Sequence, residues 1–441
     1  MINYFVENEV IEFTQIESLC RKYKVSFVDF KDYFSRKKII DIKNDNTQKR
    51  QIKFRYVGLI SFGDLILFIL PKYIKNKSNN EYNLKHSKLI VKVFYKYVEV
   101  KKNLINDELE TLNYIDEKLN YNKITIFKFF IEDYIKYGLY TSRKAEYEKN
   151  GTDSINWGKT VQYNNVIISN GRPIYIDMFT NKKSIDEDCT IRLIHKYILT
   201  KAIKFFTKLD LFDFSINFSD YIDLPYDDNE YISNLLSNRL NVEFIDRNVR
   251  LIKSMKAYID KEKFNYNENE INIYGTREFE YVWEEVNSHI FDNHYKDSIT
   301  EIEKPILFKY GFTKGNKPKG KLTPDVVNLD VKNDVLYIID SKYYDFYFNS
   351  VGEIEGQYPS TYDIVKQLAY EDKLKKRKLA GKIINAFAIP SLGKIESVGY
   401  VHFDLFDTDG KIHIININVE EAYNNFLNQK LIDINSIKFV M

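Results

Sequence analysis

Three charged side chains in one short stretch have the types and spacing for hydrolytic chemistry. Residues 322–345 read LTPDVVNLDVKNDVLYIIDSKYYD, so Asp325 precedes one apolar run and the triplet Asp340, Ser341, Lys342 ends the next. Alternation along a strand puts Asp340 and Lys342 on the same face. Two carboxylates and an ammonium group converging on one point are typical of a binding site. The alternative is a solvated strand end with a surface ion pair worth under about 1 kcal/mol.

The pattern suits metal-assisted hydrolysis of a phosphodiester. Mg²⁺ takes oxygen ligands, usually one or two carboxylates together with substrate and water. Asp325 and Asp340 would supply carboxylates from neighbouring strands, and the backbone carbonyl of Ser341 would complete the metal shell. The ammonium group of Lys342 would orient the attacking water or stabilise the charge that develops on the phosphate.

Two flanking helices would contribute further side chains. We choose Glu284 as the acid on the preceding helix, with Glu280 one turn earlier as its substitute. On the following helix, Gln367 and Tyr370 are three residues apart and share a face. That face would contact the acidic pair or a DNA phosphate; ordinary packing is the alternative.

A lysine-rich segment leads directly to Asp325. Residues 303–325 contain six lysines and one glutamate, which suits a loop that follows a DNA backbone. A solvated loop is the alternative. The lysines that we predict to bind DNA are Lys314, Lys317, Lys319 and Lys321.

The elements that must position these residues form a third part of the chain, residues 263–441. We expect a helix over residues 276–291, with Thr276 as its N-cap. Strands over 325–330 and 335–339 would follow, and then a helix over 361–374. The remaining elements are expected as strands over 383–391, 396–406 and 411–419 and a helix over 420–431. This order predicts a compact α/β unit with a mixed sheet.

Two further parts precede it. In residues 1–115 we expect two strands within 49–75, with a hairpin turn at Gly63 and Asp64 and an end at Pro71, and then an amphipathic helix. A boundary falls at 106–118. Residues 116–262 would contain a helix over 124–140, a loop, two strands joined at Asn170 and Gly171, a helix carrying His195 in a structural role, and a broken helix over 231–258.

Three features of the sequence are each open to two interpretations. We interpret Trp157 as a core anchor, with a base-stacking platform as the alternative. Residues 49–55 read as a basic edge strand that would reach DNA or a partner, or that only prevents aggregation. The strand pair around Asn170 would be a DNA-contacting wing or a plain hairpin.

Composition excludes several classes of protein. The 441 residues carry a formal charge of +2, so any attraction to nucleic acid must come from a local patch. The two cysteines are too few for a disulfide framework or a cysteine-based zinc site, and the six histidines are scattered without metal-ligand spacing. Neither a signal peptide nor a membrane span is apparent, and we expect a cytoplasmic protein with no membrane partner.

Short blocks spread along most of the chain resemble a known family. They are residues 56–74 (YVGLISFGDLILFILPKYI) and 147–161 (YEKNGTDSINWGKTV), then EYVWEEV, TPDVV, YIIDSKYYD and DIVKQLAYE in that order. The third part resembles the PD-(D/E)xK nuclease superfamily. The whole chain is similar to the LlaJI-type restriction endonuclease family, relatives of the McrC nuclease subunit. The implied fold class is α+β or mixed: a β-rich N-terminal domain that binds a partner or DNA, a mixed middle region, and a nuclease domain with a mixed central sheet flanked by helices.

The resemblance implies a Mg²⁺-dependent (or Mn²⁺-dependent) endonuclease that cleaves double-stranded DNA in restriction of foreign DNA. Asp325 and Asp340 would be metal ligands, Lys342 the catalytic lysine and Glu284 the helix acid. Gln367 and Tyr370 would be supporting residues.

The resemblance also implies a partner, a McrB-like AAA+ GTPase whose hexameric ring receives the N-terminal part of the nuclease subunit. Because the chain has no GxxxxGK[ST] motif, nucleotide-driven translocation would come from that other protein. Two alternatives are a self-sufficient type II enzyme and a non-catalytic DNA-binding or assembly protein on a degenerate nuclease fold.

Overall fold

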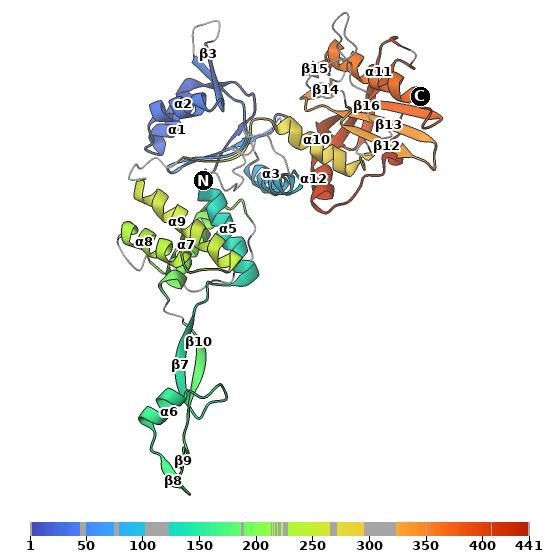
Figure 1. The fold of residues 1–441 in the computed structure, drawn as a ribbon. Coiled ribbons are helices and arrows are strands. Elements are labelled where there is room, and N and C mark those ends of the chain that lie inside the picture. Colours follow the sequence, from blue (N-terminus) through green and yellow to red (C-terminus); the bar gives the residue numbers. More distant parts are fainter. Residues whose placement is uncertain are drawn as a thin grey trace, which may run out of the picture. The chain divides into compact units, whose positions relative to one another are not determined.

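The chain folds into two compact units of mixed α and β structure (Figure 1). One contains residues 1–120 and 269–441, and the other contains residues 121–268. The first and third predicted parts of the chain therefore lie together in one unit, and the second part corresponds to the other. The computed structural model describes residues 2–44, 50–74, 79–101, 123–186, 189–212, 214, 216, 218, 222–223, 228–264, 271–294, 323–349, 351–406 and 408–439.

A four-stranded sheet anchors the N-terminal region. Its order is β1 (Asn3–Val6), β6 (Leu65–Leu70), β5 (Val57–Phe62) and β11 (Ile271–Thr276). Every residue of β5 and β6 is buried, so this strand pair belongs to the core. The turn at Gly63, with φ of 57°, and the strand end before Pro71 are confirmed.

Strand β11 gives this sheet its fourth member from a distant part of the sequence. It pairs antiparallel with β5, with Gly275 opposite Gly58. Thr276 ends this strand, and its hydroxyl accepts the N–H of Glu278 at 3.0 Å. The expectation that Thr276 caps the next helix was wrong, because Thr276 is the last residue of β11. Helix α10 (Phe279–Ile290) begins three residues later, with Glu278 at its N-cap.

A second, three-stranded sheet corrects another expectation. Its order is β2 (Ile11–Glu12), β4 (Arg50–Phe54) and β3 (Ile40–Asn44), so β4 is paired on both sides and is not an edge strand. Alternation along β4 puts Lys53 on the face opposite the buried Ile52 and Phe54. Helices α1 (Phe13–Lys22), α2 (Phe27–Arg36) and α3 (Asn80–Val100) complete the region, and the predicted amphipathic helix is confirmed as α3.

The third part of the chain builds a five-stranded mixed sheet. Its order is β12 (Val326–Asp330), β13 (Val335–Ser341), β16 (Lys382–Ser391), β18 (Lys411–Asn418) and β17 (Glu396–His402). The three central strands are parallel and the outer pairs are antiparallel. The mixed sheet and its strand order along the chain agree with the sequence prediction.

Three helices pack on this sheet (Figure 1). Helix α11 (Thr361–Lys375) covers the face of Leu336 and Ile338, where Tyr370 and Leu374 join a buried cluster. Helices α10 and α12 (Val419–Leu427) pack against each other and against the sheet. A small hairpin of β14 (Phe346–Phe348) and β15 (Ile354–Gly356) follows β13.

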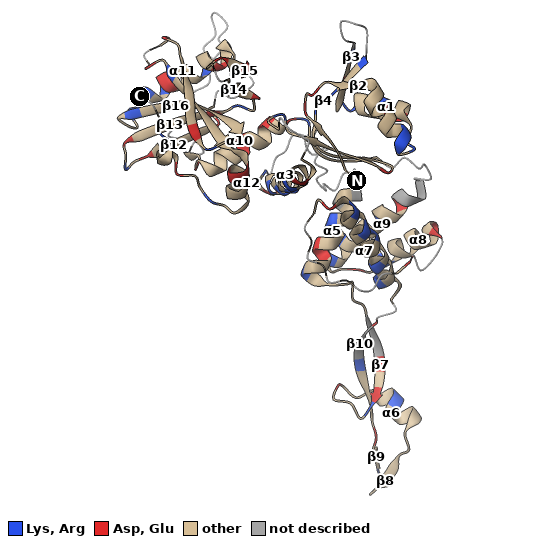
Figure 2. Cartoon of the chain, turned by 180° about the vertical axis from the view of Figure 1, so that it is seen from behind, with Lys and Arg blue, Asp and Glu red and all other residues tan. Residues whose placement is uncertain are grey.

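The unit of residues 121–268 is a helical bundle with an arm. The bundle contains α5 (Lys123–Tyr137), α7 (Thr190–Leu209), α8 (Asn229–Leu240) and α9 (Asp246–Phe264), so the predicted break within residues 231–258 is confirmed. Helix α7 carries Lys and Arg but no Asp or Glu, as the blue bands in Figure 2 show. His195 on α7 is fully buried, which confirms its structural interpretation. No described helix is long and apolar enough to span a bilayer.

The arm projects from this bundle as a long antiparallel ribbon (Figure 1). It consists of β7 (Arg143–Lys149) and β10 (Phe179–Ile185), the helix α6 (Trp157–Tyr163), and a hairpin of β8 (Ile167–Ser169) and β9 (Arg172–Ile174). The turn at Asn170 and Gly171 is confirmed, with positive φ at both residues. The loop expected before this hairpin contains β7 and α6 instead.

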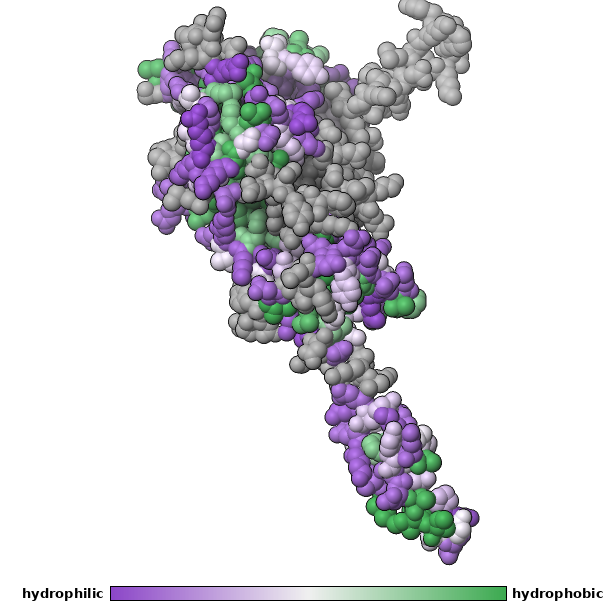
Figure 3. Space-filling model, turned by 90° about the vertical axis from the view of Figure 1, so that its left-hand side faces the viewer, coloured by the Kyte–Doolittle hydropathy of each residue, from purple (hydrophilic) through white to green (hydrophobic). Residues whose placement is uncertain are grey.

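Trp157 is not a core residue, which corrects our interpretation. It is 56% exposed at the start of α6, because the narrow arm has no second layer to cover it. Other large apolar side chains of the arm are exposed as well, and they colour its end green in Figure 3.

Candidate active site

Antiparallel pairing of β12 with β13 brings the two aspartates together. Val326 is opposite Ile339, so Asp325 lies at the start of β12 beside Asp340 at the end of β13. The backbone N–H of Ser341 donates to Oδ2 of Asp325 at 2.7 Å and joins the two strand ends. Asp340 is almost completely buried and Asp325 is half-buried.

Lys342 lies on the same side as Asp340, as strand alternation predicts. Its Nζ is 2.7 Å from Oδ2 of Asp340 and 2.6 Å from Oδ1 of Asp363. Burial opposes the charge of this ammonium group, but the two carboxylates outweigh burial and raise the pKa of Lys342 above its usual range. Lys342 is therefore charged and held between two acids.

Two residues of α11 belong to this cluster and were not predicted. Asp363 accepts from Lys342 and from the hydroxyl of Tyr344, and it also forms a capping box with Ser360. Lys366, one turn further along α11, approaches Oδ1 of Asp340 at 3.2 Å. The sequence did carry a signal for the start of this helix, since Ser-x-x-Asp at residues 360–363 is a capping-box pattern.

Glu284 is the acid of α10 that faces the aspartates. Burial raises the pKa of its carboxyl group to about 8, with repulsion from Asp325 and Asp340 as the next causes. Burial and the charge of Asp340 likewise raise the pKa of Asp325 to about 7, although the N–H of Ser341 opposes the shift. Both raised pKa values therefore have the same two causes, burial and the neighbouring carboxylates.

The other acids of α10 point elsewhere. Glu280 is close enough to Glu7 and Lys72 to influence the pKa of both, and Glu285 pairs with Lys101 at 2.9 Å. The structure therefore brings Glu284, rather than its substitute Glu280, to Asp325 and Asp340.

Gln367 and Tyr370 contact backbone rather than the acidic side chains. The fully buried amide of Gln367 donates to the carbonyl groups of Ile338 and Ala386 on neighbouring strands at 3.2 and 3.3 Å. The Tyr370 hydroxyl donates to the carbonyl of Thr323 at 3.0 Å, two residues before Asp325. Lys314, Lys317, Lys319 and Lys321 lie outside the described residues.

The donor set suits a hard divalent cation. Four carboxylates, those of Glu284, Asp325, Asp340 and Asp363, meet two ammonium groups, those of Lys342 and Lys366. Among the described residues, no three acid, His or Cys side chains are already arranged around one metal position. Mg²⁺ usually takes only one or two protein carboxylates with water, so Asp325 and Asp340 would be a sufficient pair. The carbonyl of Ser341 as a further ligand stays a prediction.

Comparison with known proteins identifies the class to which this chain belongs, the restriction endonucleases. Residues 56–421 match the model of the LlaJI restriction endonuclease family, and the chain belongs to this family. A curated relative from Bacillus subtilis (strain 168), the type II restriction enzyme BsuMI component YdjA, is 30% identical over 403 residues, which cover 88% of this chain and 83% of the relative.

Two solved structures are similar at a lower level. A chain of the Thermococcus gammatolerans assembly of McrB AAA+ hexamers with bound McrC is 16% identical, with 97% of this chain and 99% of that chain covered and a TM-score of 0.37. A chain of the Thermococcus gammatolerans McrBC complex is 12% identical, with 58% and 80% covered and a TM-score of 0.22.

Proposed function

We propose that this member of the restriction endonuclease family is the DNA-cleaving subunit of a restriction system and requires Mg²⁺ or Mn²⁺. The observation that carries the proposal is the meeting of Glu284, Asp325, Asp340 and Lys342 at one end of the β12 and β13 pair. Clustered carboxylates with raised pKa values are costly in a protein and are concentrated at functional sites. Residues 325–342 lie within the segment that matches the family.

A divalent cation bound by Asp325 and Asp340, with Glu284 beside them, would polarise a phosphodiester and lower the pKa of a bound water. The chain's own groups supply the rest. The ammonium group of Lys342 can donate to a phosphate oxygen, where it stabilises the charge that develops during hydrolysis. Asp363 keeps this lysine charged and oriented, and Lys366 offers a second ammonium group beside Asp340.

We also propose that cleavage depends on a second subunit. The relative is named a component of a type II restriction enzyme, which favours an assembly of several chains. A McrB-like AAA+ GTPase remains our proposed partner, because this chain lacks a nucleotide-binding P-loop motif of its own. The name of this relative also favours a second candidate, a type II enzyme whose cleavage of double-stranded DNA needs no nucleotide.

The test is cleavage of plasmid DNA by the purified chain, alone and with the product of a neighbouring gene for an AAA+ protein. Reactions would contain Mg²⁺, Mn²⁺ or EDTA, each with and without GTP. We expect cleavage only with a divalent cation. A requirement for GTP and the partner would support the motor-driven subunit, and cleavage without them would support the type II enzyme.

Variants of the cluster connect cleavage to these residues. Asp340→Asn and Lys342→Ala are expected to lower the cleavage rate by about a hundredfold or more while leaving the fold intact. Lys394→Ala, at an exposed position after β16, is the matched control and should cleave normally. Equal cleavage by the cluster variants would reject the site. DNA binding without cleavage under every condition would indicate the non-catalytic alternative.

A further inference from the structure

A tyrosine next to Lys342 connects the candidate site to the N-terminal sheet. The buried side chain of Tyr343 donates its hydroxyl hydrogen to Oε2 of Glu7 at 2.6 Å. The same hydroxyl accepts the backbone N–H of Lys72 at 3.1 Å. Glu7 follows β1 and Lys72 follows β6, which are adjacent parallel strands, so the hydroxyl is held by two neighbouring strand ends.

Successive side chains after β13 are held from opposite sides. Lys342 and Tyr344 both contact Asp363 on α11, whereas Tyr343 between them contacts Glu7. The backbone N–H of Lys342 also donates to the carbonyl of Ala388 at 2.9 Å. A shift of Tyr343 would therefore move the segment that carries Lys342.

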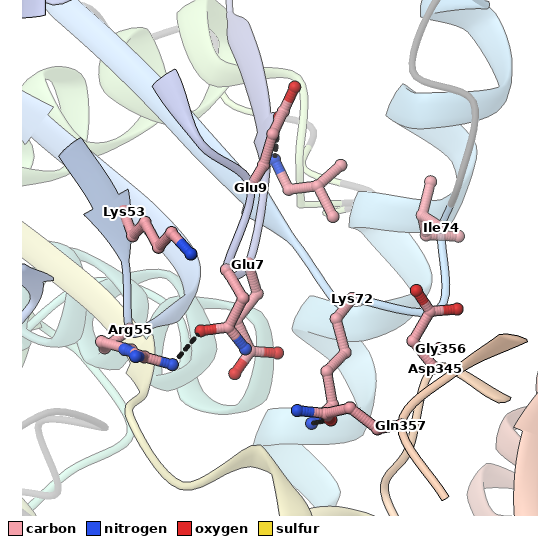
Figure 4. A pocket seen from close by; sticks show the side chains of 11 residues that line it. Glu7, Glu9, Lys53, Arg55, Lys72, Ile74, Asp345, Gly356 and Gln357 are labelled. Carbon is pink, nitrogen blue, oxygen red and sulfur yellow. Dashed lines mark hydrogen bonds between the residues drawn. The ribbon is translucent and has the colours of Figure 1, made fainter. Parts of the chain in front are cut away.

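A pocket of about 640 Å³ lies beside this contact, and its lining includes Glu7, Arg55, Lys72 and Gln357 (Figure 4). Nζ of Lys72 donates to Oε1 of Gln357 at 3.0 Å and lies 4.5 Å from the ring centroid of Tyr343. Glu7 is buried, and burial raises its pKa despite the hydrogen bond from Tyr343 and the charge of Lys72. Keeping a carboxyl group here is costly, and an ordinary apolar contact would hold two regions together without it.

We propose that the hydrogen bond between Tyr343 and Glu7 is a positioning contact, through which the N-terminal sheet holds Lys342 and Asp340 in their working arrangement. Tyr343 is a positioning residue and not a catalytic one, since its hydroxyl faces Glu7. The effect of this hydrogen bond on cleavage rests on the proposed function. Its effect on the geometry of residues 340–342 is independent of that function.

The experiment compares three variants of this contact with a matched control. Tyr343→Phe keeps the ring that packs against Phe279 and loses the hydroxyl. Glu7→Ala removes the acceptor, whereas Glu7→Gln keeps an oxygen that can accept. The control is Tyr73→Phe, because the Tyr73 ring lies 6.3 Å from that of Tyr343 but its hydroxyl bonds to Tyr423 and His86.

The first measurement is hydrogen exchange in peptides that cover residues 339–345, which include the protected N–H groups of Ser341 and Lys342. Tyr343→Phe and Glu7→Ala should each speed this exchange by about tenfold, while Glu7→Gln and Tyr73→Phe stay close to wild type. In DNA cleavage, the first two variants should lower kcat by about tenfold with KM for DNA unchanged.

Opposite results would overturn the proposal. One such result is an unchanged exchange rate over residues 339–345 in Tyr343→Phe. The other is an equal change of the exchange rate in Tyr343→Phe and Tyr73→Phe. Either result would show that the contact only supports the fold. If wild type fails to cleave DNA, the proposed function fails, yet the exchange results still decide whether Glu7 and Tyr343 position this segment.

Discussion

Asp325 accepts the backbone N–H of Ser341 at 2.7 Å, so the carboxylate at the start of β12 is tied to the end of β13. One carboxylate oxygen is thus used for structure, and the side chain still faces Asp340 and Glu284, whose charges affect the same cluster. Such a hydrogen bond would orient Asp325 for the proposed metal ion.

Asp325→Asn separates these two uses. Asparagine keeps an oxygen for the Ser341 N–H and loses the charge, so the fold should persist and binding of Mg²⁺ or Mn²⁺ should weaken by at least about tenfold. Calorimetric titration of wild type and variant with each ion measures the difference. Identical affinities would remove Asp325 from the proposed ligands.

Asp363 is expected to act on catalysis through Lys342. Removing its charge in Asp363→Asn weakens the pair with Lys342, and we expect the cleavage rate to fall by about tenfold. Ser360→Ala is the control, since it removes the hydroxyl of the capping box and leaves the pair between Asp363 and Lys342. This control should lose about 1 kcal/mol of stability, measured by urea unfolding, with normal cleavage. A similar loss of cleavage in both variants would assign Asp363 to helix capping alone.

His195 predicts how stability changes in acid. Burial lowers the pKa of its imidazole from 6.5 to about 3, and its Nδ1 accepts the N–H of Tyr140. The unfolded chain binds a proton below pH 6.5 that the folded chain binds only near pH 3. The contribution of His195 is therefore complete above pH 6.5 and is lost as pH falls toward 3, by up to about 1.4 kcal/mol per pH unit.

Unfolding free energies between pH 4 and 7 test this expectation. His195→Gln should be less stable than wild type at pH 7 and should depend less steeply on pH. His402→Gln, at an exposed position of β17, should keep the wild-type slope. An unchanged slope in His195→Gln would contradict the assignment.

Gly275 is required for the close approach of β11 to β5. A Cβ atom at this position would lie 2.1 Å from the carbonyl oxygen of Val57 and 2.8 Å from the Cα of Gly58. Gly275→Ala should therefore destabilise the chain by roughly 1–3 kcal/mol in thermal or urea unfolding. Gly158 lies on helix α6, where a Cβ atom would be 3.5 Å from Oδ1 of Asn156, an ordinary contact distance. The stability of Gly158→Ala should therefore be unchanged or slightly higher. Equal stability of the two variants would show that β11 pairs differently.

The sequence alone determined the elements of the five-stranded sheet and the core of the candidate site. Strands β12, β13, β16 and β18 and helix α11 agree with the predicted ranges, because apolar runs and alternation report burial directly. The same alternation placed Lys342 beside Asp340. Resemblance of short ordered blocks identified the family, which the match over residues 56–421 confirms.

Only the tertiary structure decided which long-range neighbours complete these elements. Glu284 and Glu280 lie one turn apart on α10, and sequence spacing cannot tell which one faces Asp325. The pairing of β11 with β5 depends on segments far apart in the chain, and so does the approach of Asp363 and Lys366 to Asp340 and Lys342. The exposure of Trp157 follows from the absence of a second layer over the arm. Local residue patterns set the state of a segment, whereas contacts between distant segments arise only when the whole chain packs.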